Sequence, residues 1–130
     1  VFHDLGVADN IYQVTPDEDA DITYNLPAGI SIITTTKGYC WWVLTGGKGV
    51  GRWRGTLTGT AAIGVSARAA GVGAGADVGT LDVLSGAGNP TVTYALLDKL
   101  QNGYIGVAET LPVAGSLSLI DVALRRSYRI

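Results

Sequence analysis

The chain is poor in the side chains that usually carry chemistry. Its 130 residues include one His, one Cys and no Met, and only 15% of them are charged, against about 25% in an average soluble domain. A single Cys excludes a disulfide within the chain, and one His with one Cys cannot form a zinc site without carboxylates. These shortages argue against an enzyme, and we expect neither a cofactor nor a metal.

Long apolar runs are also missing. The longest uncharged segments, 22–36 and 83–97, both contain Pro and Gly and are shorter than the roughly 18 residues expected of a membrane span. Residues 1–4 lack the basic head and apolar stretch of a secretory signal. A net charge of −2 argues against strong nonspecific binding to nucleic acid.

What the chain does have is 19 Gly residues and many Ala, Val, Leu, Ile and Thr. The apolar residues occur in short alternating runs, the period of a half-buried strand, and turn signals containing Gly, Pro or Asn separate them. Eight or nine short strands at this spacing are typical of a sandwich, jelly roll or barrel. We predict an all-β jelly-roll or β-sandwich fold with strands over 11–15, 21–25, 30–36, 39–45, 50–58, 61–66, 78–84, 104–108 and 117–128.

Three segments depart from this pattern. Residues 1–20 are expected to form an extended N-terminal arm before a single β domain over 21–130. Residues 67–76 are mostly Gly and Ala, which favours a mobile loop or arm. Thr93 and Gly103 stand where the caps of a short helix over 94–102 belong, although a strand over 91–97 also suits this sequence.

Residues 39–58 hold all three Trp residues and predict a β-hairpin with its turn at 46–49. The register of that hairpin sets Trp42 opposite Trp53 and Trp41 opposite Arg54. Since side chains alternate along a strand, Trp42 and Trp53 would share the core face with Cys40. Cys40 is therefore expected to be a buried, inert thiol.

The opposite face of this hairpin carries Tyr39, Trp41, Arg52 and Arg54. One interpretation is a half-solvated sheet face with Arg54 stacked on Trp41. A second is an interface with another subunit, because Trp, Tyr and Arg dominate interface hot spots. A third is a platform for a sugar or for single-stranded nucleic acid, although the low pI counts against nucleic acid.

Charges of opposite sign lie in separate segments. Asp17, Glu18, Asp19 and Asp21 form an acidic cluster that lacks the Gly and Glu of an EF-hand loop. This cluster is interpreted as a solvated loop, a weak Ca²⁺ site or a docking segment for a basic surface. Basic residues gather elsewhere, at Lys48, Arg52, Arg54, Arg125, Arg126 and Arg129.

Such separation suits self-assembly or docking, and it equally suits neighbours within one chain. The candidate partner-interface residues are Tyr39, Trp41, Arg52, Arg54, Asp17, Asp19, Asp21, Arg125 and Arg129.

The arm over 1–20, the hairpin with its Tyr-Cys-Trp-Trp and Gly-Arg-Trp-Arg stretches (39–42 and 51–54), and the C-terminal strand over 117–130 occur together. In this whole-chain character the sequence resembles the small jelly-roll virion proteins of tailed bacteriophages, especially the cement (decoration) proteins of short-tailed phage capsids. The resemblance implies a non-enzymatic structural protein that bridges neighbouring subunits of the major capsid protein. It also implies a symmetric homo-oligomer, a dimer or trimer, on the virion surface after assembly in the host cytoplasm.

The alternative is a fibre-tip or lectin-like module that binds glycans. An exposed, unpaired Trp41 in a shallow pocket would favour glycan binding, whereas Trp41 buried against a second chain would favour the structural role. A small β-barrel hydrolase or isomerase would instead need a pocket with converging Asp, Arg and Tyr side chains.

Overall fold

The computed structural model describes residues 1–3, 14–16, 27–70, 78–83 and 103–124. Within them are nine strands and no helix, and thus no helix long and apolar enough to cross a membrane. Two short antiparallel pairs come first, β1 (Phe2–His3) with β2 (Val14–Thr15) and β3 (Ile30–Ser31) with β4 (Val43–Leu44). The predicted all-β class of short antiparallel strands, to which sandwiches and jelly rolls belong, is confirmed.

The remaining strands form one curled antiparallel sheet. They are β5 (Gly46–Arg52), β6 (Ser66–Ala70), β7 (Thr80–Val83), β8 (Tyr104–Ala108) and β9 (Leu117–Ala123), in the order β5-β9-β8-β6-β7. Directly after β5, Trp53 forms a parallel bridge with Leu81 of β7, and the Arg54 amide donates to the Leu81 carbonyl at 2.9 Å. Because β5 and β7 are the two ends of the strand order, this contact makes the sheet a partly closed barrel.

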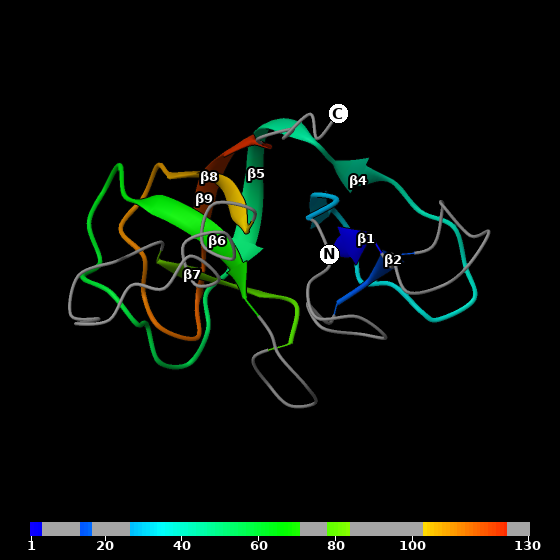
Figure 1. Cartoon of the computed structure of the whole chain (residues 1–130), viewed down its shortest axis with the longest axis horizontal. Coiled ribbons are helices and arrows are strands. Elements are labelled where there is room, and N and C mark those ends of the chain that lie inside the picture. Colours follow the sequence, from blue (N-terminus) through cyan, green and yellow to red (C-terminus); the bar gives the residue numbers. More distant parts are fainter. Residues whose placement is uncertain (4–13, 17–26, 71–77, 84–102, 125–130) are drawn as a thin grey trace, which may run out of the picture.

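Figure 1 shows the barrel on one side of the molecule and β1 to β4 on the other. We call the second part the β1–β4 lobe. Within the described residues, the main buried cluster lies in the barrel and contains Trp53, Ala67, Ala69, Leu81, Val83, Ile105, Ala108, Ile120 and Val122. Alternation in β9 sends Ile120 and Val122 inward and Leu119 and Asp121 outward. Trp53, the largest core side chain, donates from its indole nitrogen to the Ser118 hydroxyl.

The glycines of β5 allow two other strands to approach it closely. A Cβ at Gly51 would overlap the Leu81 side chain, and a Cβ at Gly49 would overlap the Leu44 side chain. Without side chains at these two positions, β5 accommodates Leu81 of β7 and Leu44 of β4. The glycine-rich run is therefore a strand, and the prediction of a turn at 46–49 is wrong.

The predicted hairpin over 39–58 is also wrong. β5 pairs over its whole length with β9, from Gly46 opposite Ala123 to Arg52 opposite Leu117. The strand expected over 39–45 is reduced to β4, which pairs with β3. Residues 43–44 pair with β3 and β5 pairs with β9, so Trp42 and Trp53 are not opposite one another.

Two further expectations need correction. β1 and β2 pair with each other, and the Ala28 amide donates to the Val1 carbonyl at 2.8 Å. Residues 1–3 and 14–16, the described part of 1–20, therefore do not form one extended arm. Residues 67–70 are not a loop but part of β6, an inner strand of the barrel. Small side chains suit this position because Ala67, Ala69 and Ala70 are all buried. The rest of that segment, 71–76, and the expected helix over 94–102 lie outside the described residues.

Candidate interaction surface

The loop between β3 and β4 is the most exposed apolar segment that the structure describes. Ile30 opposite Leu44 and Ser31 opposite Val43 fix the base of this loop. Residues 32–42, which we call the 32–42 loop, are shaped by two local hydrogen bonds. The Ser31 hydroxyl donates to the Ile33 carbonyl at 2.6 Å, and the Tyr39 amide donates to the Thr36 carbonyl at 3.3 Å.

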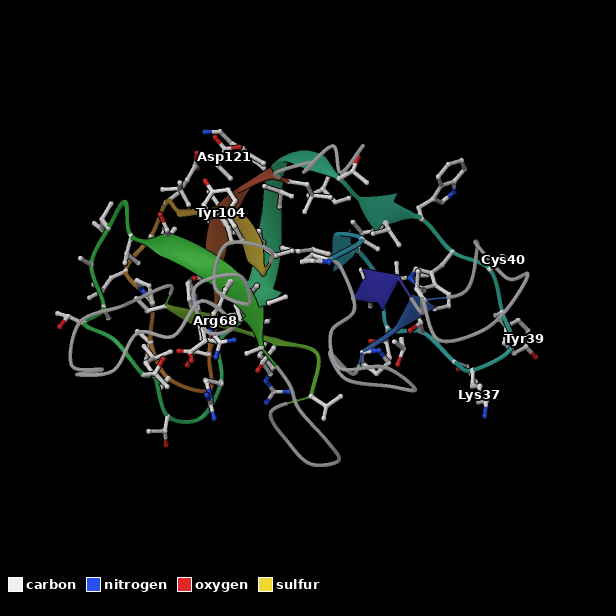
Figure 2. The ribbon with its side chains drawn as sticks, in the orientation of Figure 1. Lys37, Tyr39, Cys40, Arg68, Tyr104 and Asp121 are labelled. Atoms are coloured by element: carbon white, nitrogen blue, oxygen red, sulfur yellow. The ribbon has the colours of Figure 1, made fainter. Side chains whose placement is uncertain are left out.

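Four large apolar side chains of this loop are between 57% and 83% exposed, namely Ile32, Ile33, Tyr39 and Trp42. Single exposed hydrophobic residues are normal on protein surfaces, but clusters mark interaction sites. Figure 2 shows Lys37, Tyr39 and Cys40 at the end of the β1–β4 lobe that lies farthest from the barrel. The 32–42 loop is therefore well placed to contact another molecule.

The two adjacent tryptophans differ in exposure, and the predicted burial of Trp42 is wrong. Trp42 is exposed, whereas Trp41 is half-buried and its indole nitrogen has neither solvent nor a hydrogen-bond partner among the described residues. Cys40 is an exposed free thiol, so its prediction as a core residue is wrong. Both errors follow from pairing this segment with β5.

Arg54 lies in an internal network and not beside Trp41. The fully buried carboxylate of Asp82 accepts from Arg54 Nη1 at 3.2 Å and from the Thr58 hydroxyl at 2.7 Å, and its distance to Arg68 Nη2 is 3.6 Å. Its other oxygen accepts from the amides of Thr58 and Val83 at 3.0 and 2.8 Å. We call this the Asp82 network.

Asp82 is not among the residues predicted from the sequence to be important, although one signal points to it. It is the lone acidic residue in the short run Thr80–Val83, all four residues of which are buried. A carboxylate at such a position needs several donors because an uncompensated buried charge is costly. The network ties the segment after β5 to β6 and β7, and its role is to hold the barrel together.

The structure does not bring the predicted interface residues onto one face. Tyr39 and Trp41 belong to the 32–42 loop, Arg54 is internal, and Arg52 is exposed on the barrel. Lys48 forms an ion pair with Glu109 at 3.2 Å. The other predicted interface residues, which lie outside the described residues, are Asp17, Asp19, Asp21, Arg125 and Arg129.

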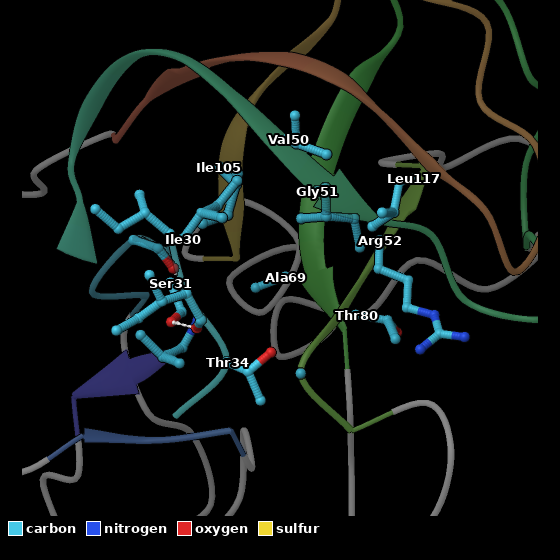
Figure 3. Close-up of a pocket in the computed structure, with 16 residues that line it drawn as sticks. Ile30, Ser31, Thr34, Val50, Gly51, Arg52, Ala69, Thr80, Ile105 and Leu117 are labelled. Atoms are coloured by element: carbon cyan, nitrogen blue, oxygen red, sulfur yellow. Dashed lines mark hydrogen bonds between the residues drawn. The ribbon is translucent and has the colours of Figure 1, made fainter. Parts of the chain in front are cut away.

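An open cavity of about 380 Å³ lies between the β1–β4 lobe and the barrel. Figure 3 shows side chains from both parts around it, with Ala69 near the middle. Its described lining includes four exposed apolar side chains, Ile32, Ile33, Val50 and Leu117, and the buried Leu81 and Ile105. The volume lies in the range of small-ligand sites, and the mostly apolar lining suits an apolar group.

The α-amine of Val1 also lines the cavity and donates to the Gly29 carbonyl at 2.8 Å. Burial lowers the pKa of this amine from 8.0 to about 6, because removal from water disfavours the charged form. Arg52 is the one charged side chain among the described lining residues, which include neither Asp nor Tyr. The described wall of the cavity thus carries little charge at neutral pH.

Metal binding receives no support from the part of the chain that the structure describes, where no group of three or more His, Cys, Asp or Glu could hold an ion. Comparison with known proteins gave no match: no family model, no curated protein and no solved structure matches the chain. The function is therefore argued from the surfaces of the molecule itself.

Proposed function

We propose that this chain is a non-enzymatic virion structural protein that binds a bacteriophage capsid and stabilises it by bridging neighbouring subunits. Its partner is the major capsid protein, and its place is the virion surface. The character of the whole sequence supports the virion role. The observation that carries the docking role is the 32–42 loop, which exposes Ile32, Ile33, Tyr39 and Trp42. Tyr39 lies at the end of the β1–β4 lobe that is farthest from the barrel (Figure 2).

The chemistry of the loop supports docking onto protein. Burying apolar surface contributes roughly 25 cal/mol per Å², and aromatic side chains in the centre of an interface commonly dominate its binding energy. The turn at Gly38, where φ is +91°, and the hydrogen bonds at Ser31 and Tyr39 define the backbone before any partner arrives. A loop that is already shaped loses less conformational entropy on binding.

The test is co-sedimentation of the purified chain with empty capsids of the phage that encodes it. We expect the Trp42→Ser variant to bind on the order of 30-fold more weakly, the effect of losing one hot-spot side chain. Ile63→Ser is the matched control, because Ile63 is similarly exposed at 71% but lies outside the 32–42 loop. Thermal melts of both variants check that the fold is kept.

Capsid stability gives the second readout. Bound wild-type chain is expected to raise the temperature at which the capsids dissociate, and Trp42→Ser is expected to lose that effect at equal total protein. Failure of the wild-type chain to bind capsids would contradict the proposal. So would capsid binding that is equally strong in Trp42→Ser and wild type.

The exposed aromatic rings of Tyr39 and Trp42 favour one other candidate, a fibre-tip or lectin-like module. Aromatic faces stack on sugars, and two of them stand in the same loop. A glycan array probed with the wild-type chain and with Trp42→Ser separates the two functions. Binding to a glycan that Trp42→Ser loses, together with no binding to capsids, would assign the loop to glycan recognition.

A further inference from the structure

The outer face of β5 and β9 is a second exposed surface, and at Val50, Arg52 and Leu117 it borders the cavity that Ile32 and Ile33 also line. Alternation sends every second residue of both strands outward, and the register sets these outward residues directly opposite one another. We call the three pairs the β5–β9 outer face: Lys48 with Asp121, Val50 with Leu119, and Arg52 with Leu117.

The centre of this face is apolar. Val50, Leu119 and Leu117 are between 37% and 68% exposed, and they are neighbours either across the strands or two residues apart along β9. Opposed side chains on a sheet lie about 4.5–5.5 Å apart at Cβ. The three therefore form one continuous apolar patch instead of scattered exposed residues.

The two ends of the face carry opposite charges. Arg52 stands at one end and Asp121 at the other, and neither has an ion-pair partner within the part of the chain described. Lys48, beside Asp121, is already paired with Glu109. The Arg52 and Asp121 positions are four residues apart along the strands, or about 13 Å, with the apolar patch between them. Asp121 lies on the outside of the barrel (Figure 2).

We propose that a second copy of this chain packs face to face on the β5–β9 outer face. In a symmetric dimer the same patch serves both partners. With the strands of the two copies nearly antiparallel and crossing at about 30°, the usual angle of aligned sheets, Arg52 lies over Asp121 of the partner subunit. The reciprocal pair forms at the other end, and the apolar patches cover each other between them.

The charge pattern favours a second copy over an unrelated partner. A face with a basic end, an apolar centre and an acidic end is complementary to itself when turned end to end, and no other molecule is needed to satisfy it. The β5–β9 outer face includes neither Tyr39 nor Trp42. It does not rest on the capsid-binding role, and it is tested on the purified chain alone.

The experiment is a charge-swap complementation followed by sedimentation equilibrium. Arg52→Asp sets Asp against Asp121 of the partner subunit twice in each dimer, and Asp121→Arg sets Arg against Arg52 in the same way. Each variant is expected to dimerise at least about tenfold more weakly than wild type. An equal mixture of the two variants is expected to dimerise again, because both contacts in the mixed dimer are then between opposite charges.

Lys37→Asp is the matched control, since Lys37 is exposed in the 32–42 loop and the variant changes the net charge as Arg52→Asp does. It is expected to dimerise like wild type at the same ionic strength. Leu117→Ser removes the most exposed apolar residue of the patch and is expected to weaken the dimer without unfolding the chain.

Three results would overturn the inference. The first is a wild-type chain that stays monomeric up to about 1 mM, the weakest affinity worth calling a dimer. The second is a mixture of Arg52→Asp and Asp121→Arg that dimerises no better than either variant alone. The third is a Lys37→Asp control that loses the dimer as Arg52→Asp does, because net charge and not the β5–β9 outer face would then govern association.

Discussion

Asp82 is the residue on which the internal charges of the barrel converge. Its side chain is fully buried, its two oxygens accept four hydrogen bonds from Arg54, Thr58 and Val83, and the Arg68 guanidinium lies beside them as an ion-pair partner. Burying a carboxylate is costly unless charge and hydrogen bonds compensate it. Arg54 and Arg68 supply the charge, and Thr58 and Val83 supply backbone donors, so the carboxylate acts as a fixed cross-link between segments that are distant in sequence.

We expect Asp82→Asn to lower the free energy of unfolding by about 3–5 kcal/mol, because removing one partner leaves the guanidinium groups without the charge that faces them. Glu109→Gln is the control, since it removes an ion pair whose partner, Lys48, is 70% exposed, and it should cost less than about 1 kcal/mol. Urea unfolding of both variants measures the difference. Equal losses in the free energy of unfolding would mean that burial does not make the Asp82 network more stabilising than an exposed ion pair.

At the level of the elements, β5 depends on glycine where two other strands approach it. We expect Gly51→Ala to destabilise the barrel by about 1–3 kcal/mol, the usual cost of inserting a methyl group into a filled interior, because the new Cβ would overlap Leu81. Gly46→Ala, in the same strand, meets only the Val122 carbonyl at 3.9 Å and is expected to be neutral or slightly stabilising. Thermal melts compare the two, and similar melting temperatures would contradict the close approach of β7.

The strands that could be predicted from the sequence are those whose evidence is local. The alternation of apolar residues predicts the bounds of β8, 104–108, and the first residue of β9, both as observed. The same alternation along β9 explains why Ile120 and Val122 are buried in the core. The partner of β5 could not be predicted in this way, because glycine-rich runs occur both in turns and in strands that pack closely. Only the pairing with β9, far along the chain, decides between these two structures.

The candidate surfaces were harder to predict, for the same physical reason. Trp42 is expected in the core because residues 39–45 are paired with 50–58 in the predicted hairpin, and which residues of a strand face solvent depends on the pairing partner. The exposure of Trp42 and Cys40 was therefore missed. The meeting of Arg54 and Arg68 at Asp82 is likewise a tertiary contact, and no spacing in the sequence encodes it.

On the scale of the whole molecule, the described residues of the two parts contribute unequally to the core. Among them, every member of the buried core cluster belongs to the barrel or to the bridge at Trp53, whereas the β1–β4 lobe contributes the partly buried Ile30 and Leu44 at its edge. Strands of two residues also form few ladder hydrogen bonds. The 32–42 loop, the proposed docking surface, is thus carried by the part of the fold with the smaller share of the core.

We therefore expect amide hydrogen exchange to proceed at two levels. Amides of β8 and β9, in the centre of the sheet order, should exchange only on global unfolding, and those of β3 and β4 should exchange at least about 100-fold faster through local opening. Mass spectrometry of peptides covering 30–44 and 104–123 measures both rates in one sample.

Addition of a docking partner should slow exchange in 30–44 far more than in 104–123, because binding stabilises the segment that it contacts. Equal protection of the two peptides in the free chain would show that the β1–β4 lobe unfolds only together with the barrel.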